Sequence, residues 1–175
     1  MDHEQIEFFV PEEGSRTALL RTFRAPLSRV FEAWTSDALV AAWWGPLTID
    51  VTECELDFRE GGAYRIAMRH ESGPDYTATG TFNNIVIARR FTMVNDLSEH
   101  PDDWMQMFRP RGSAYEDVPV VWNYDVSFED DDDEHTTVKV LTTYPIREDR
   151  DRFVSLHGES GWAESFVKLD RLLAR

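Results

Sequence analysis

The sequence predicts an α+β fold in which a mainly antiparallel sheet wraps around one long helix at the C-terminal end. From Leu47 to Tyr144, apolar and polar residues alternate in several segments, a pattern typical of half-buried strands joined by short connections. Near the end of the chain the spacing becomes helical, and it forms one apolar stripe of Trp162, Phe166, Leu169 and Leu173. Such a stripe is buried when its helix lies against a sheet, so the two patterns together indicate the fold class.

The elements before the sheet follow from local signals. Residues 1–15 form a polar lead-in, and residues 17–23 are predicted to form a first strand. Pro26 suits the first turn of a helix, where a missing N–H does no harm, and a second short helix comes after it. That second helix should end at Gly45-Pro46, because glycine accepts a left-handed conformation and proline cannot continue a helix.

About six strands succeed the two short helices, and they are predicted to pair as an antiparallel meander. They are expected at residues 47–55, 63–70, 76–82, 85–94, 120–128 and 138–144. The acidic run at residues 130–134 lies between the last two, and we interpret it as a solvated hairpin tip. A calcium loop would need ligands at alternating positions and a glycine for the turn, and the run has neither.

Residues 148–175 are predicted to form a single helix, because Glu148 and Asp149 suit a first turn and the segment contains no proline. Toward the start of this helix, the apolar stripe continues through Glu159 and Ser155, with glycines beside them. The first half of the face is therefore small or polar. It either lies beyond the core or lines a space that the protein leaves open.

Residues 95–117 interrupt the series of short connections. The segment is long for a hairpin and carries four large apolar side chains, Trp104, Met105, Met107 and Phe108. Pro101 marks the start of a short helix that should run through Phe108. Because a patch of this size is normally covered, we expect the segment to act as a lid over the sheet opening or as part of a homodimer contact.

The composition suits one domain over residues 1–175, with 95–117 as an insertion, since 175 residues of which 42% are hydrophobic can bury a core. No apolar run reaches ~18 residues and the first five residues do not resemble a signal peptide, so we expect a cytoplasmic protein without membrane insertion. The single cysteine, Cys54, suits a reducing compartment. A net charge of −15 disfavours nucleic acid as a partner, and no motif predicts a cofactor or a metal ion.

Four stretches carry a resemblance to a known family: residues 24–34, then Trp43-Trp44-Gly45-Pro46, then residues 57–64 with Gly61-Gly62, and finally Gly161-Trp162. The chain resembles the SRPBCC (START-like, helix-grip) superfamily, in the branch of homologues of the C-terminal domain of the activator of heat-shock-protein-ninety ATPase. The resemblance implies a strongly curved seven-stranded antiparallel sheet that grips the C-terminal helix, with a largely apolar cavity between them. It also offers structural roles for Gly61-Gly62, which permit a turn or bulge, and for Asp57 and Arg59, which could pair beside it.

The leading hypothesis is that a hydrophobic or aromatic small molecule binds between the sheet and the last helix. The candidate binding residues are Trp44, Tyr64, Met68, Trp104, Phe108, Trp122, Tyr124, Ser155, Glu159 and Trp162. A second hypothesis is an enzyme of the cyclase, dehydratase or hydrolase kind, with Glu159 and His70 as proton-transfer groups. For both residues, a side chain that faces solvent is the interpretation favoured over a catalytic one. A third, taken from the family name, is a co-regulator of a chaperone ATPase.

Overall fold

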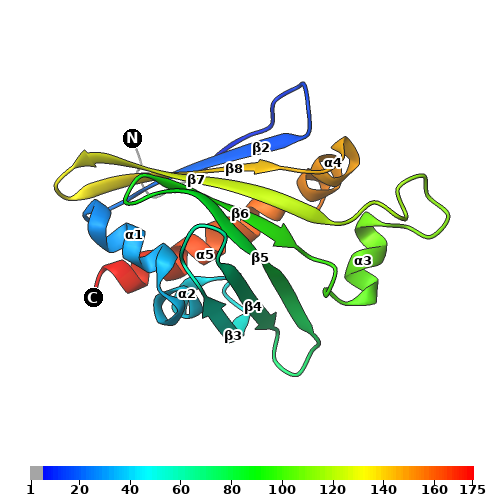
Figure 1. Ribbon diagram of the computed structural model, residues 1–175, viewed down its shortest axis with the longest axis horizontal. Helices are drawn as coiled ribbons and strands as arrows, with labels where there is room; N and C mark the ends of the chain where they lie inside the picture. The colour runs from blue at the N-terminus through cyan, green and yellow to red at the C-terminus, as the bar shows by residue number, and fades with distance from the viewer. Residues whose placement is uncertain (1–5) are drawn as a thin grey trace.

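The computed structural model describes residues 6–175, and within them it has one antiparallel sheet of eight strands and five helices (Figure 1). The strands are β1 (Glu7–Phe9), β2 (Arg16–Phe23), β3 (Asp50–Leu56), β4 (Ala63–Arg69), β5 (Asp75–Val86), β6 (Arg90–Asp96), β7 (Val121–Asp132) and β8 (His135–Thr143). The helices are α1 (Leu27–Thr35), α2 (Asp37–Trp43), α3 (Asp102–Phe108), α4 (Arg147–Ser155) and α5 (Gly158–Leu173).

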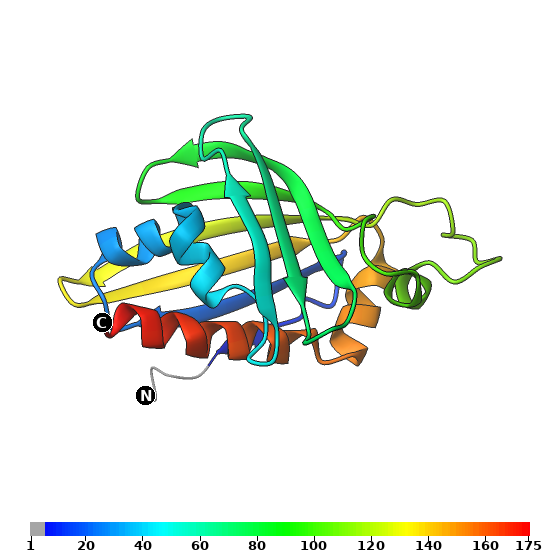
Figure 2. The same ribbon diagram turned by 90° about the horizontal axis from the view of Figure 1, so that it is seen from below.

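The sheet has the order β1-β2-β8-β7-β6-β5-β4-β3, and each neighbouring pair is antiparallel. In Figure 2, β2 and β8 run along α5, whereas β3 and β4 cross the direction of that helix. The sheet therefore bends strongly around α5, and the predicted α+β class with a gripped C-terminal helix is confirmed. The meander from β3 to β8 is also as predicted, because each of these strands pairs with the next in sequence.

The core lies between the concave face of the sheet and the helices α1, α2 and α5. Phe166, Leu169 and Leu173 of the predicted stripe are buried, with Phe166 packed edge-on against Phe23 of β2. The indole of Trp43 is fully buried, and its Nε1–H donates to the carbonyl oxygen of Ala33 at 2.8 Å. Helices α1 and α2 are thus fixed to each other and to α5 by large aromatic side chains.

The sheet has eight strands instead of the seven that the resemblance implied. The additional strand, β1, lies in the expected polar lead-in, of which residues 1–5 fall outside the described residues. It forms one edge of the sheet and pairs with β2, with Phe8 opposite Leu19. A strand of three residues is too short for an alternation to be recognised in the sequence.

The prediction of one helix over residues 148–175 is wrong, because the chain forms α4 and α5 with a break at Leu156 and His157. His157 adopts a left-handed conformation with φ of 54°. At the start of α5, a Cβ on Gly158 would lie 2.1 Å from Cε2 of Phe153, so only glycine lets this ring pack against the helix backbone. The break turns α4 away from the axis of α5, as Figure 2 shows.

Two hairpin ends differ in detail from expectation. β5 continues through Asn83 and Asn84 as far as Val86, with a register shift after Asn83 and a φ of 54° at Asn84. The turn into β6 therefore falls at residues 87–89. The acidic run of residues 130–134 lies at the exposed end of the β7–β8 hairpin, which agrees with a solvated tip.

The glycine pair before β4 makes the turn that was expected of it. Gly61 has φ of 71°, and a Cβ on Gly62 would lie 1.9 Å from the carbonyl oxygen of Asp57. Asp57 and Arg59 pair beside this turn at 2.8 Å, on the exposed surface. The motif is therefore structural, and it sets the start of β4.

Candidate functional site

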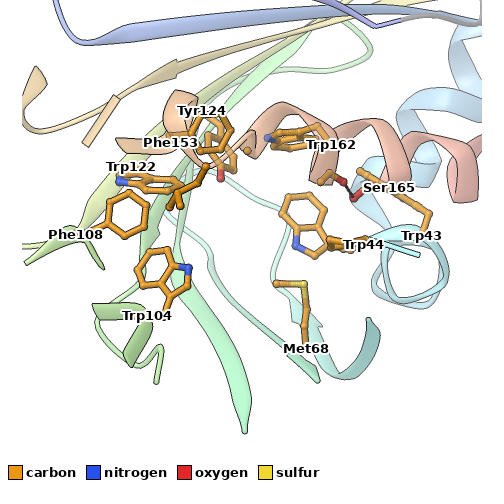
Figure 3. A pocket seen from close by; sticks show the side chains of 15 residues that line it. Trp43, Trp44, Met68, Trp104, Phe108, Trp122, Tyr124, Phe153, Trp162 and Ser165 are labelled. Carbon is orange, nitrogen blue, oxygen red and sulfur yellow. Dashed lines mark hydrogen bonds between the residues drawn. The ribbon is translucent and has the colours of Figure 1, made fainter. Parts of the chain in front are cut away.

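A cavity of about 290 Å³ lies between the start of α5, the end of α2 and the sheet (Figure 3). Fifteen residues line it: Trp43, Trp44, Gly45, Pro46, Met68, Trp104, Phe108, Trp122, Tyr124, Phe153, Leu156, Gly158, Gly161, Trp162 and Ser165. Five of the six tryptophans of the chain are among them. Leu156 is 46% exposed, so the lining reaches the surface at the break between α4 and α5.

The cavity exists because the first two turns of α5 carry little bulk. Gly158 and Gly161 belong to its lining, and a Cβ on Gly161 would meet only Cγ of Pro46, at 3.6 Å. One turn further along, Phe166 and Leu169 fill the space between helix and sheet completely. Of the small or polar half of the helix face that the sequence indicated, the glycines Gly158 and Gly161 line an open space, whereas Ser155 and Glu159 do not.

Aromatic rings form the wall between α5 and the sheet. The ring of Trp162 lies 5.5 Å from that of Tyr124 on β7 and 5.7 Å from that of Trp44, measured between centroids. It also stacks on Trp34, with an interplanar angle of 19°. These contacts fix the orientation of Trp162, whose face forms part of the lining.

A second aromatic group closes the opposite end of the cavity. The ring centroids of Trp104 and Phe108 of α3 lie 4.5 Å apart. Both rings contact Trp122 of β7, with centroid distances of 5.9 Å and 5.3 Å. The two α3 residues are one helical turn apart, which places them on the same face. Of the four apolar residues predicted for this segment, Met107 is instead 39% exposed, and Met105 packs against the core outside the cavity lining.

The segment between β6 and β7 is fastened to α4 by a buried ion pair. Both terminal nitrogens of the Arg109 guanidinium donate to the carboxylate of Asp149, and the two residues are only 4% and 1% exposed. Arg109 also donates to the carbonyl oxygens of Val118 and Pro119. The ion pair therefore fixes the position of Trp104 and Phe108, because Arg109 directly follows Phe108 in the chain and is bound to α4.

The corner from Trp44 to Ile49 is held by one side chain of α5. Lys168 Nζ lies 3.1–3.4 Å from the carbonyl oxygens of Trp44, Gly45, Pro46 and Ile49. Burial lowers the pKa of Lys168, and the nearby charge of Asp50 opposes this shift. Gly45 has φ of 86°, and its Cβ position lies 2.8 Å from Sδ of Met68, so the corner can approach β4 only with glycine there.

The hydroxyl of Tyr124 is a buried polar group that faces the cavity. Tyr124 is 9% exposed, and its hydroxyl has no hydrogen-bond partner among residues 6–175. Burial raises the pKa of Tyr124 above its ordinary value, so the phenol keeps its proton. No Asp, Glu, Lys, Arg or His side chain belongs to the lining.

Seven of the ten candidate binding residues line the cavity: Trp44, Met68, Trp104, Phe108, Trp122, Tyr124 and Trp162. Tyr64 of β4 lies outside the cavity lining. Its side chain is buried, and its hydroxyl donates to the carbonyl oxygen of Val94. Ser155 is exposed and donates to the carbonyl oxygen of Arg152. Glu159 also lies outside the lining, with one carboxylate oxygen 3.5 Å from Nδ1 of His157 and the other buried without a partner among the described residues.

The two candidate proton-transfer groups are not brought together. His70 is exposed at the turn after β4 and, like Glu159, is not part of the lining. The lining includes residues that the sequence did not point to, chiefly Trp43, Phe153, Leu156 and Ser165. A continuous helix through residues 148–175 would turn Phe153 away from the face that carries Phe166. Phe153 reaches the cavity only because the helix breaks at His157.

The described part of the chain holds neither a metal-binding cluster nor a membrane-spanning helix. Among residues 6–175, no group of three or more His, Cys, Asp or Glu side chains could hold a metal ion. None of the helices in these residues is both long enough and apolar enough to cross a membrane.

Comparison with known proteins gives a family and a set of similar folds. The family model described as activator of Hsp90 ATPase homolog 1-like protein matches residues 24–174. A solved structure from Rhodobacter sphaeroides has a TM-score of 0.79 at 20% identity, covering 97% of this chain and 99% of the other. A solved structure of a protein from Mycobacterium smegmatis has a TM-score of 0.76 at 17% identity, covering 96% of this chain and 96% of the other. A search of curated proteins found no match.

A third similar structure is named after the same family. This protein from Silicibacter pomeroyi superposes with a TM-score of 0.63 at 22% identity, covering 91% of this chain and 98% of the other. At these identities the structural matches show a shared fold.

Proposed function

The chain belongs to the activator of Hsp90 ATPase homolog 1-like family, and from this premise we propose that it binds a hydrophobic or aromatic small molecule between the sheet and α5. The observation that carries the proposal is a cavity of about 290 Å³ lined by five tryptophans and no charged side chain. Ligand sites are concave, mostly apolar and carry a few oriented polar groups. A solid core would instead have used bulk at Gly161, where a Cβ has room.

The size of the cavity limits the ligand. Small-molecule sites span roughly 300–1,000 Å³, so a cavity of about 290 Å³ suits a molecule of two or three fused rings or a short acyl chain. Flat aromatic walls favour a planar ligand, because stacked and edge-on ring contacts add to the gain from area burial. We therefore place planar aromatic molecules first among the candidates.

A thermal-shift and native mass-spectrometry screen against neutral hydrophobic compounds tests the proposal. Binding should raise the melting temperature of the protein and add one ligand mass per chain. In Gly161→Leu, which projects a side chain into the cavity, both signals should disappear. Val167→Leu, a change on the 36% exposed face of the same helix, should retain them. Binding that survives in Gly161→Leu would refute this location.

A proton-transfer enzyme built on Glu159 and His70 finds no support in the geometry, since neither residue lines the cavity. The thiol of Cys54 gives no support to nucleophilic chemistry either, because burial raises its pKa to about 11. We also propose a cytoplasmic location, since a single cysteine suits a reducing compartment. The chaperone role in the family name stays a prediction, to be tested by stimulation of a chaperone ATPase.

A further inference from the structure

The polar atoms that face the cavity are nearly all hydrogen-bond donors. In Figure 3, the indole nitrogens of Trp44, Trp104 and Trp162 point into the space between the walls, as does the hydroxyl of Tyr124. None of the four has a hydrogen-bond partner among residues 6–175. The other two tryptophans differ: Trp43 donates to Ala33, and the nitrogen of Trp122 points away from the space.

The acceptors that could serve a ligand are already engaged. The carbonyl oxygens of Trp44, Gly45 and Pro46, at the corner that lines the cavity, accept from Lys168. The carbonyl oxygen of Phe108 accepts from Arg109 at 2.7 Å. On α5, the carbonyl oxygen of Gly161 accepts from the hydroxyl of Ser165 at 2.8 Å. These backbone carbonyl oxygens are thus engaged within the protein, whereas the three indole N–H groups and the phenol have no partner among residues 6–175.

We infer that the ligand is a neutral planar molecule carrying a hydrogen-bond acceptor without a donor, such as an aromatic ketone or quinone, with its oxygen directed at Tyr124 and the indole N–H groups. Indole is a donor only, and a phenol that keeps its proton can donate to a carbonyl oxygen. A ligand hydroxyl or amine would bring a proton that has to compete for the hydroxyl oxygens of Tyr124 and Ser165, because the carbonyl oxygens named above are engaged. A carboxylate would be buried without a cation in a chain of net charge −15.

This inference rests on the proposed function and deepens it, and it predicts an order of affinity among molecules of one shape. Fluorenone carries a carbonyl oxygen, fluorenol carries a hydroxyl at the same position, and fluorene carries neither. Fluorenone should bind about 10-fold more tightly than fluorene, because one hydrogen bond gained in an apolar site has that effect. Fluorenol should bind more weakly than fluorenone.

Equilibrium dialysis of the three compounds against the full chain tests the order. If none of them binds, the proposed function itself fails. If all three bind with equal affinity, or fluorenol binds most tightly, the ligand site stands and the preference for an acceptor is overturned.

Substitutions then locate the donor. Tyr124→Phe should bring the affinity for fluorenone to within about 2-fold of that for fluorene, with fluorene unchanged. Tyr144→Phe is the matched control, because the hydroxyl of Tyr144 is engaged with Thr17 Oγ1 at 3.1 Å. This variant should leave the ratio of the affinity for fluorenone to the affinity for fluorene as in the parent protein. Trp104→Phe, at a half-buried position, should also lower the ratio and serves if Tyr124→Phe does not fold. A ratio unchanged in both Tyr124→Phe and Trp104→Phe overturns the inference.

Discussion

His100 lies where the chain leaves β6, and its surroundings keep the imidazole neutral. Its Nδ1–H donates to the carbonyl oxygen of Thr77 at 2.9 Å, and its ring lies 4.3 Å from that of Trp104 and 5.6 Å from that of Tyr76. Burial lowers the pKa of His100 to about 4, and the bond to Thr77 opposes this shift. The neutral ring thereby supports the tryptophan that forms the cavity wall.

The depressed pKa makes stability depend on pH. Unfolded His100 takes up a proton near pH 6.5, whereas folded His100 does so near pH 4. The contribution of the neutral ring is therefore complete above pH 6.5 and is lost as the pH falls toward 4, by roughly 1–3 kcal/mol. Urea denaturation from pH 7 to pH 4 should show this loss in the parent protein and a smaller one in His100→Asn. Parallel curves for the two proteins would contradict the assignment.

At the scale of elements, the break between α4 and α5 depends on the close approach of Phe153 to Gly158. The ring occupies the position of a Cβ on that glycine, and it contacts both Trp122 and Tyr144 of the sheet at 5.7 Å. Gly161 has no such neighbour, since only Pro46 comes near, at 3.6 Å. The two glycines of the same helix thus have different reasons for being small.

Alanine at these two positions should act in opposite directions. Gly158→Ala forces Phe153 to move and should lower the free energy of unfolding by about 1–3 kcal/mol. Gly161→Ala should leave it unchanged or raise it by up to about 1 kcal/mol, because alanine is the better helix former and the space is free. Urea denaturation of the two variants beside the parent measures both. Equal losses at both positions would show that helix propensity and packing at Phe153 do not explain the break.

The helix break also shows what sequence periodicity can and cannot reveal. The stripe through Phe166 and the alternation in β7 place Trp122, Tyr124 and Trp162 correctly, because one regular element carries each pattern. Ser155 and Glu159 enter the predicted cavity only if the helical repeat continues through His157, where the left-handed residue resets the phase. The residues next to His157 give no signal of the break, because it depends on the ring of Phe153, which packs against Gly158 from the preceding helix.

At the scale of the whole molecule, Arg109 is one of several contacts that connect residues 97–120 to the rest, beside the bond from His100 to Thr77 and the packing of Trp104 on Trp122. The buried pair with Asp149 joins this segment to α4, and no regular strand pairing holds it. This contact has no signal in the sequence, because the two residues are 40 positions apart and neither carries a recognisable motif. The predicted short helix, by contrast, follows from Pro101 and the acidic residues after it, and it is confirmed as α3.

Removing one partner of the Arg109–Asp149 ion pair should destabilise the protein. Arg109→Met leaves the carboxylate of Asp149 buried without its partner and should lower the free energy of unfolding by about 3–5 kcal/mol. The double variant Arg109→Met with Asp149→Leu should lose less than the single variant, because no charge stays buried alone. Urea denaturation of both proteins checks this. A double variant that loses the sum of two large single effects would mean that the residues act independently.

The position of α5 in the chain has a consequence for biosynthesis. The last residue of β8, Thr143, and the end of α5, Leu173, are separated by about 30 residues, which a ribosome adds in roughly 2–6 s. During that interval the nascent chain carries every described strand of the sheet but not α5, so Phe23 lacks its contact with Phe166. The protein therefore passes through a brief stage in which the part of the concave apolar face that α5 covers is open to chaperones and to other nascent chains.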